Sequence, residues 1–85
     1  ATASEFPFTI GREGCSFNIT GDNRISRRHV QITESNGRFF VTDLGSRNGA
    51  FLNGTHLEAN QPAPLIGSST LQLGSQTSIQ LEPQT

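Results

Sequence analysis

The hydrophobic residues of this chain occur in short alternating or paired groups, and no window holds the 3.6-residue apolar period of a helix over two or three turns. Alternation with a period of two is typical of strands that bury one face. The pattern therefore predicts an all-β protein with strands at Phe8–Ile10, Phe17–Ile19, His29–Thr33, Arg38–Thr42, Ala50–Leu52, Thr55–Leu57, Thr70–Leu73 and Ser78–Leu81.

Turn residues separate these strands. Asn36-Gly37 and Asn53-Gly54 are strong hairpin signals, because a type I′ turn needs positive φ at both central residues. Many short strands with such turns indicate a β-sandwich of two largely antiparallel sheets, with loops gathered at its ends. The polar inserts are the predicted loops: Gly11–Ser16, Thr20–Arg28, Asp43–Gly49 and Glu58–Pro64.

The apolar positions within the strands supply the predicted core. Its expected members are Val30, Ile32, Phe40, Leu44, Phe51, Leu57, Leu71, Leu73, Ile79 and Leu81. The segment from Glu58 to Ser69 carries two prolines and no clear alternation, so it is expected to be a flexible connection.

A chain of 85 residues can bury one modest core, which predicts a single domain. The small polar ends are typical of linkers that join a module to a longer protein. We assign residues 8–82 to the domain, residues 1–7 to a linker or residual edge strand, and residues 83–85 to a second linker.

The distribution of charge is more informative than the net charge of -1. All six basic residues are arginines, and five of them lie in or beside the first three predicted loops. The guanidinium group presents a planar fork of donors that suits a carboxylate or a phosphate. The exception, Arg38, follows a hairpin turn and is expected to be a solvated strand residue.

Neither catalysis nor a metal site is indicated. Cys15, His29 and Asp43 are residue types of a nucleophilic site, but a cysteine beside a short strand is more often a small buried hydrophobe. The remaining acids and histidines do not cluster, so we expect no enzyme activity, metal or cofactor.

A single cysteine excludes an internal disulfide and fits a reducing compartment, cytoplasmic or nuclear. There is no apolar run of transmembrane length, so no membrane contact is expected.

Three motifs follow one another along the chain. Gly11-Arg12 ends the first strand, "SRRH" spans Ser26–His29, and "DLGSRNG" spans Asp43–Gly49. In this order they resemble the forkhead-associated (FHA) domain, a β-sandwich that binds phosphothreonine peptides. The likeness runs from about Phe8 to Leu81. It implies a module that recruits a protein phosphorylated by a Ser/Thr kinase. A phosphorylated segment of the module's own parent chain is one candidate for this partner.

The resemblance also implies roles for individual residues. Arg12 is similar to the principal phosphate-binding arginine of the family, Ser26 to its phosphate-binding hydroxyl, and Arg27 lies at the next position, which often reaches the phosphate. A phosphothreonine brings nearly two negative charges and three acceptor oxygens, so donors converging from separate loops suit it.

The other motif residues would orient the peptide and the loops. Asn48 matches the asparagine that hydrogen-bonds the peptide backbone, and His29 matches a buried histidine that ties loops together. Gly11 and Gly49 would be structural.

Two further arginines are candidates for specificity. Arg24 lies two residues before Ser26, and we hypothesise that it favours an acidic residue C-terminal to the phosphothreonine, at about the third position. Arg47, next to Asn48, is the second candidate. For both, a plain solvated loop arginine is an equally open interpretation.

Other functions remain as alternatives. An FHA-like sandwich can bind a protein without phosphate through a sheet face, and arginine-rich loops can bind nucleic acid. The negative net charge and the placement of phenylalanines in strand patterns argue against nucleic acid.

The chain also departs from the family: FHA domains usually have a further strand where this chain has "ATASEFP". A sandwich without it would have an uncovered edge.

Overall fold

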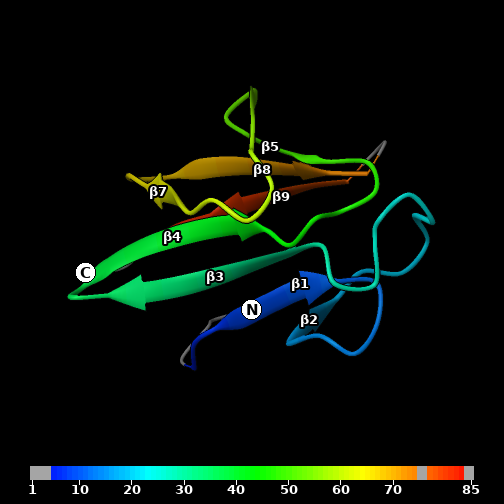
Figure 1. The fold of residues 1–85 in the computed structure, drawn as a ribbon, viewed down its shortest axis with the longest axis horizontal. Helices are drawn as coiled ribbons and strands as arrows, with labels where there is room; N and C mark the ends of the chain where they lie inside the picture. The colour runs from blue at the N-terminus through cyan, green and yellow to red at the C-terminus, as the bar shows by residue number, and fades with distance from the viewer. Residues whose placement is uncertain (1–4, 75–76, 84–85) are drawn as a thin grey trace.

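The computed structural model describes residues 5–74 and 77–83, and within them the chain forms short strands joined by loops (Figure 1). The strands are β1 (Phe8–Gly11), β2 (Phe17–Asn18), β3 (Val30–Ser35), β4 (Arg38–Asp43), β5 (Ala50–Leu52), β6 (Thr55–His56), β7 (Ala63–Leu65), β8 (Ser69–Leu73) and β9 (Thr77–Leu81). No helix in the described part of the chain is long and apolar enough to span a membrane.

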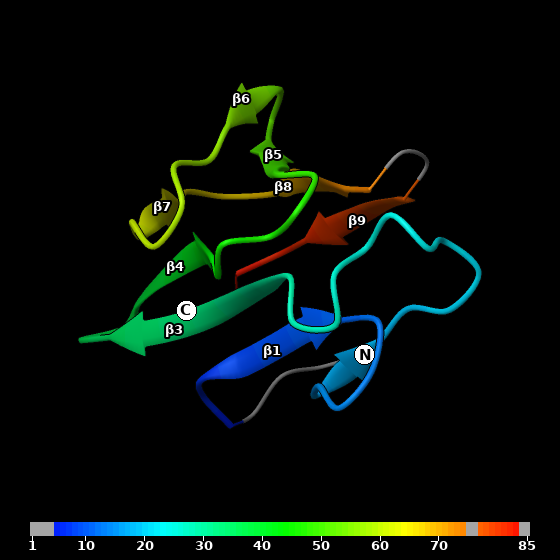
Figure 2. The ribbon, with the colours of Figure 1, turned by 45° about the vertical axis from the view of Figure 1, so that its right-hand side comes forward.

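The strands form two sheets that face each other, as the two views in Figures 1 and 2 show. One sheet has the order β2-β1-β3-β4-β7, and the other has the order β6-β5-β8-β9. The β1–β2 pair is parallel, and the other strand pairs are antiparallel. The predicted all-β sandwich of largely antiparallel sheets is therefore confirmed.

Both predicted hairpins are present. Asn36 and Gly37 have φ values of 53° and 78° between β3 and β4, and Asn53 and Gly54 have values of 50° and 83° between β5 and β6. Positive φ at both central residues is the conformation that a type I′ turn requires. These turns fix which residues lie opposite one another in each hairpin.

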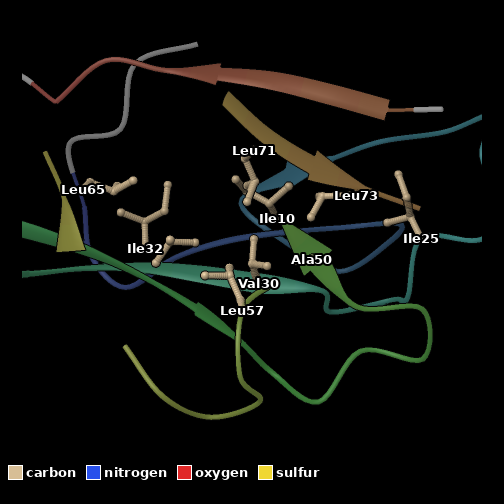
Figure 3. Packing of buried hydrophobic residues seen from close by; sticks show 10 residues of the cluster. Ile10, Ile25, Val30, Ile32, Ala50, Leu57, Leu65, Leu71 and Leu73 are labelled. Carbon is tan, nitrogen blue, oxygen red and sulfur yellow. The ribbon is translucent and has the colours of Figure 1, made fainter. Parts of the chain in front are cut away.

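The core fills the space between the sheets (Figure 3). Predicted members Val30, Ile32, Leu57, Leu71 and Leu73 are buried. Ile79 and Leu81 are half-buried on β9 and pack against this cluster. Further buried residues that the sequence pattern did not single out are Ile10, Ile25, Val41, Ala50 and Leu65.

The core prediction was wrong for Phe40 and Phe51, and the strand register explains why. Directly opposed residues of an antiparallel pair lie on the same face of the sheet. Val41 lies opposite the buried Ile32, so Phe40 takes the other face and is half-buried. Ala50 lies opposite the buried Leu73, which turns Phe51 outward, where its ring is 5.2 Å from that of His56. Phe51 is an exposed side chain.

Leu44 was also predicted to be buried, but it is half-buried. It lies just beyond the end of β4, and its N–H donates to the carbonyl oxygen of His29 at 2.9 Å. Leu44 therefore belongs to the loop that follows β4 rather than to the layer of side chains between the sheets.

The expectation of a flexible connection at Glu58–Ser69 was wrong in part, because this segment contains β7. Residues Ala63–Leu65 pair with β4, and Leu65 is buried. Pro64 lies within β7, which is an edge strand, where a missing N–H is tolerated. The two prolines interrupt the alternation of apolar residues, so the sequence pattern did not predict this strand.

The four-stranded sheet ends at β9, and in the described part of the chain no strand pairs with its outer edge. Residues 5–7 do not supply one. Phe6 instead packs against Phe39 of β4, with ring centroids 5.5 Å apart. No described strand therefore covers the outer edge of β9, and residues 1–4 of the predicted linker or residual edge strand lie outside the described residues.

Ile25 is an unexpected core residue, since it lies in the long loop between β2 and β3. Its side chain is 1% exposed. It reaches the end of β8, where its Cγ1 is 3.0 Å from the position that a Cβ on Gly74 would take. Figure 3 shows it entering the cluster on the same side as Leu73. The loop is thus anchored by a hydrophobic contact as well as by its ends.

We expect Ile25→Ala to lower the free energy of unfolding by about 2–4 kcal/mol, through lost burial and the cavity left behind. Ile66→Ala is the matched control, because Ile66 is 83% exposed and its truncation should change stability by less than about 0.5 kcal/mol. Urea denaturation of both variants measures the difference. Equal stability of the two would show that Ile25 does not anchor the loop.

Candidate functional site

The three loops that carry the motifs gather at one end of the sandwich. The first loop (residues 12–16) follows β1, the second (residues 19–29) precedes β3, and the third (residues 44–49) follows β4. Since β3 is antiparallel to both β1 and β4, its start lies beside their ends. Figure 1 shows the cyan second loop and the green third loop together on the right-hand side.

His29 connects the second and third loops from inside the protein. The residue is completely buried, and its Nδ1 accepts a hydrogen bond from the N–H of Ser26 at 3.1 Å. Because Nδ1 accepts, the ring proton lies on Nε2, which donates to the carbonyl oxygen of Gly49 at 2.7 Å. The backbone N–H of His29 also donates to the carbonyl of Ile10 at the end of β1. One residue therefore contacts β1, the second loop and the third loop.

Backbone hydrogen bonds hold the first loop against the second. The N–H of Arg12 donates to the carbonyl oxygens of Ser26 and Arg27, both at 3.0 Å. The thiol of Cys15 donates to the Arg27 carbonyl at 3.0 Å as well. A Cβ on Gly11 would stand 2.1 Å from that same oxygen, so a side chain at this position would force the two loops apart. Glycine at position 11 permits the close approach.

Two side chains join the second loop to the third. The Oγ of Ser26 accepts the N–H of Arg47 at 3.0 Å, and the Nδ2 of Asn48 donates to the carbonyl of Arg24 at 2.8 Å. Because the Ser26 oxygen acts as an acceptor here, its own hydroxyl hydrogen is left to donate elsewhere.

A buried carboxylate shapes the third loop. Asp43 accepts the N–H of Ser46 at 2.7 Å and the Ser46 hydroxyl at 2.8 Å. These bonds place Arg47 and Asn48 at the tip of the loop, where both residues are exposed.

The predicted phosphate ligands lie in adjoining loops at this end. Arg12 and Ser26 are half-buried, and Arg27 is exposed. The Arg27 Nε lies 3.2 Å from the Oε1 of Glu13, an ion pair that the sequence did not suggest. Among the described residues, Arg12, Arg24 and Arg47 form no ion pair with an acidic side chain.

Sequence reasoning missed Asp22, which fastens the second loop to the opposite sheet. Its Oδ2 accepts the hydroxyl of Thr77 on β9 at 2.9 Å, and its Oδ1 accepts the N–H of Arg24 at 3.0 Å. The local signal was an aspartate two residues before Arg24, a spacing typical of an Asx turn. The contact with Thr77 had no sequence signal.

Cys15, His29 and Asp43 each have other partners. The thiol of half-buried Cys15 bonds to backbone carbonyls, both His29 ring nitrogens bond to the backbone, and the Asp43 carboxylate bonds to Ser46. Across residues 5–74 and 77–83, no group of three or more His, Cys, Asp or Glu side chains is arranged to hold a metal ion.

Known proteins share this sequence pattern and architecture. The chain is 32% identical over 82 residues to the FHA domain-containing protein FhaB of Mycobacterium tuberculosis, which covers 96% of this chain and 51% of FhaB. It is 38% identical over 55 residues to a probable E3 ubiquitin-protein ligase, dma1, of Schizosaccharomyces pombe, where the match covers 60% of this chain and 21% of dma1. The chain thus spans about half or less of these relatives.

Solved structures show the same fold. An FHA domain of an Arabidopsis thaliana hypothetical protein superposes with a TM-score of 0.79 at 28% identity, covering 93% of this chain and 70% of that one. The N-terminal FHA domain of Saccharomyces cerevisiae Rad53p was solved in complex with a phosphothreonine peptide. It superposes with a TM-score of 0.76 at 28% identity, and the match covers 88% of this chain and 64% of that one.

The family model for the FHA domain matches residues 8–74, from the first strand to the end of β8, and so includes all three loops. This chain therefore belongs to the FHA domain family, whose members are non-catalytic binding modules.

Proposed function

We propose that this chain is a phosphothreonine-dependent peptide-binding module that recruits a partner phosphorylated by a Ser/Thr kinase. The observation that carries the proposal is that the backbone N–H of Arg12 bonds to the carbonyl oxygens of Ser26 and Arg27, which makes the three proposed ligands neighbours in two adjoining loops. The phosphothreonine peptide bound to the similar FHA domain of Rad53p supports it. A phosphorylated segment of the parent polypeptide is a second source of the same ligand.

The proposed phosphate ligands match the chemistry of a phosphate monoester. Such a group carries about -1.5 to -2 charges at neutral pH and three acceptor oxygens. Arg12 and Arg27 would donate from their guanidinium groups, and Ser26 would donate the hydroxyl hydrogen that its bond to Arg47 leaves free. Hydrogen bonds to charged groups contribute roughly 1.5–3 kcal/mol each, so the phosphate would dominate the affinity.

Asn48 would bind the peptide backbone next to the phosphate. Its amide has two N–H donors and one carbonyl acceptor, and one N–H is already directed to the Arg24 carbonyl. The side chain is exposed, so the second N–H and Oδ1 are left to pair with a C=O and an N–H of an extended peptide. The bond to Arg24 would fix the rotamer before the peptide arrives.

We expect a phosphothreonine peptide to bind at least about a hundredfold more tightly than its unphosphorylated form, because several charge-assisted bonds are lost with the phosphate. Arg12→Ala should cost at least about tenfold in affinity for the phosphopeptide. Arg38→Ala is the matched control, since Arg38 is an exposed arginine at the hairpin end of β4, away from the three loops. Calorimetry on the three proteins measures all of these affinities.

Equal affinity for the two peptide forms would overturn the proposal in favour of phosphate-independent binding. Binding of mixed oligonucleotides in an electrophoretic assay, together with no preference for the phosphopeptide, would favour a nucleic-acid interface instead.

A second prediction concerns the residues that flank the phosphothreonine. Arg24 is exposed on the second loop, and its carbonyl is held by Asn48. We expect a degenerate phosphothreonine library to show an acidic preference near the third position after the phosphothreonine, and Arg24→Ala to remove it. Arg47→Ala, the same change on the third loop, tests the other candidate. A library profile without acidic enrichment would contradict the role of Arg24.

A further inference from the structure

We propose that Glu13 is an internal competitor for Arg27, and that the phosphate of a bound peptide takes its place. The proposal rests on the function proposed above, and it adds an affinity-determining residue to the same site. The direct observation is the ion pair between Glu13 Oε1 and Arg27 Nε at 3.2 Å.

The position of Glu13 is set by the backbone. Its N–H donates to the carbonyl of Arg27 at 3.4 Å, and the neighbouring Arg12 N–H donates to that oxygen at 3.0 Å. The carbonyl of Glu13 accepts the Cys15 thiol at 3.4 Å. Because the backbones of residues 13 and 27 are adjacent in this way, the carboxylate stays within reach of the guanidinium whenever its side chain rotates toward it.

The side chains themselves are free to separate. The Glu13 side chain is 65% exposed and that of Arg27 is 75% exposed. An exposed ion pair is weak, since water screens both charges and two long side chains must be held in one arrangement. A phosphate with nearly two charges and three acceptor oxygens is the stronger partner for the same guanidinium. Rotation of the Glu13 side chain is sufficient for the exchange.

The exchange lowers the affinity of the site for phosphate. When Arg27 binds the phosphate, its ion pair with Glu13 breaks as the new one forms. The loss of the first pair cancels part of the attraction between Arg27 and the phosphate. Neutralising Glu13 should therefore strengthen phosphopeptide binding, and the gain should depend on Arg27. A simple repulsion between Glu13 and the phosphate would instead persist when Arg27 is absent.

A double-mutant cycle separates these two cases. We expect Glu13→Gln to tighten binding of a phosphothreonine peptide by about two- to fivefold, the range that corresponds to an exposed ion pair. The same change in an Arg27→Ala background should leave the affinity unchanged. Glu34→Gln removes an equal charge from an exposed position on β3, near the hairpin end, and should not affect binding. Calorimetry with one peptide serves for all variants.

An unchanged affinity in Glu13→Gln, or the same gain with and without Arg27, would overturn the proposal while leaving the proposed function intact. A wild-type domain that does not distinguish the phosphorylated from the unphosphorylated peptide would overturn the proposed function itself. The unphosphorylated peptide is therefore titrated into each variant as well, so that a failure of the Glu13 proposal can be told apart from a failure of the proposed function.

Discussion

The buried imidazole of His29 is the contact on which the binding loops depend. Both of its ring nitrogens bond to backbone groups of loops that lie far apart in sequence, at Ser26 and Gly49. In a buried site an unpaired donor or acceptor is costly, so the two loops are fixed relative to each other and to the sheet. The hydrogen bonds of Arg12 and Arg47 to Ser26 and its neighbour then extend this arrangement outward.

The second loop is also attached to the core and to the opposite sheet. Ile25 and Asp22 attach the second loop to the core and to β9, so its conformation is determined during folding rather than on binding. Ligand binding then requires little further ordering of the backbone, which favours affinity. The side chain of Arg27 is 75% exposed, so no packing contact has to be broken in the proposed exchange between Glu13 and a phosphate.

Local patterns predicted the fold well because strands and type I′ turns depend on neighbouring residues. It was harder to predict which face of each strand is buried. Phe40 and Phe51 are larger than Val41 and Ala50, so hydrophobicity alone selects them, yet cross-strand pairing places the smaller residues in the core. Ile25 was missed for a similar reason, because an apolar residue in a polar loop gives no periodic signal.

The candidate site shows the same division between local and spatial information. The resemblance predicted binding roles for Arg12, Ser26 and Asn48 from short ordered motifs, whereas the Glu13–Arg27 pair arises only when two loops meet. A count of arginines therefore overstates the positive charge that the second loop offers to a ligand. Glu13 follows Arg12 directly in the sequence, but its carboxylate pairs with Arg27 instead, and in the proposed exchange with phosphate this spatial pairing sets the affinity of the site.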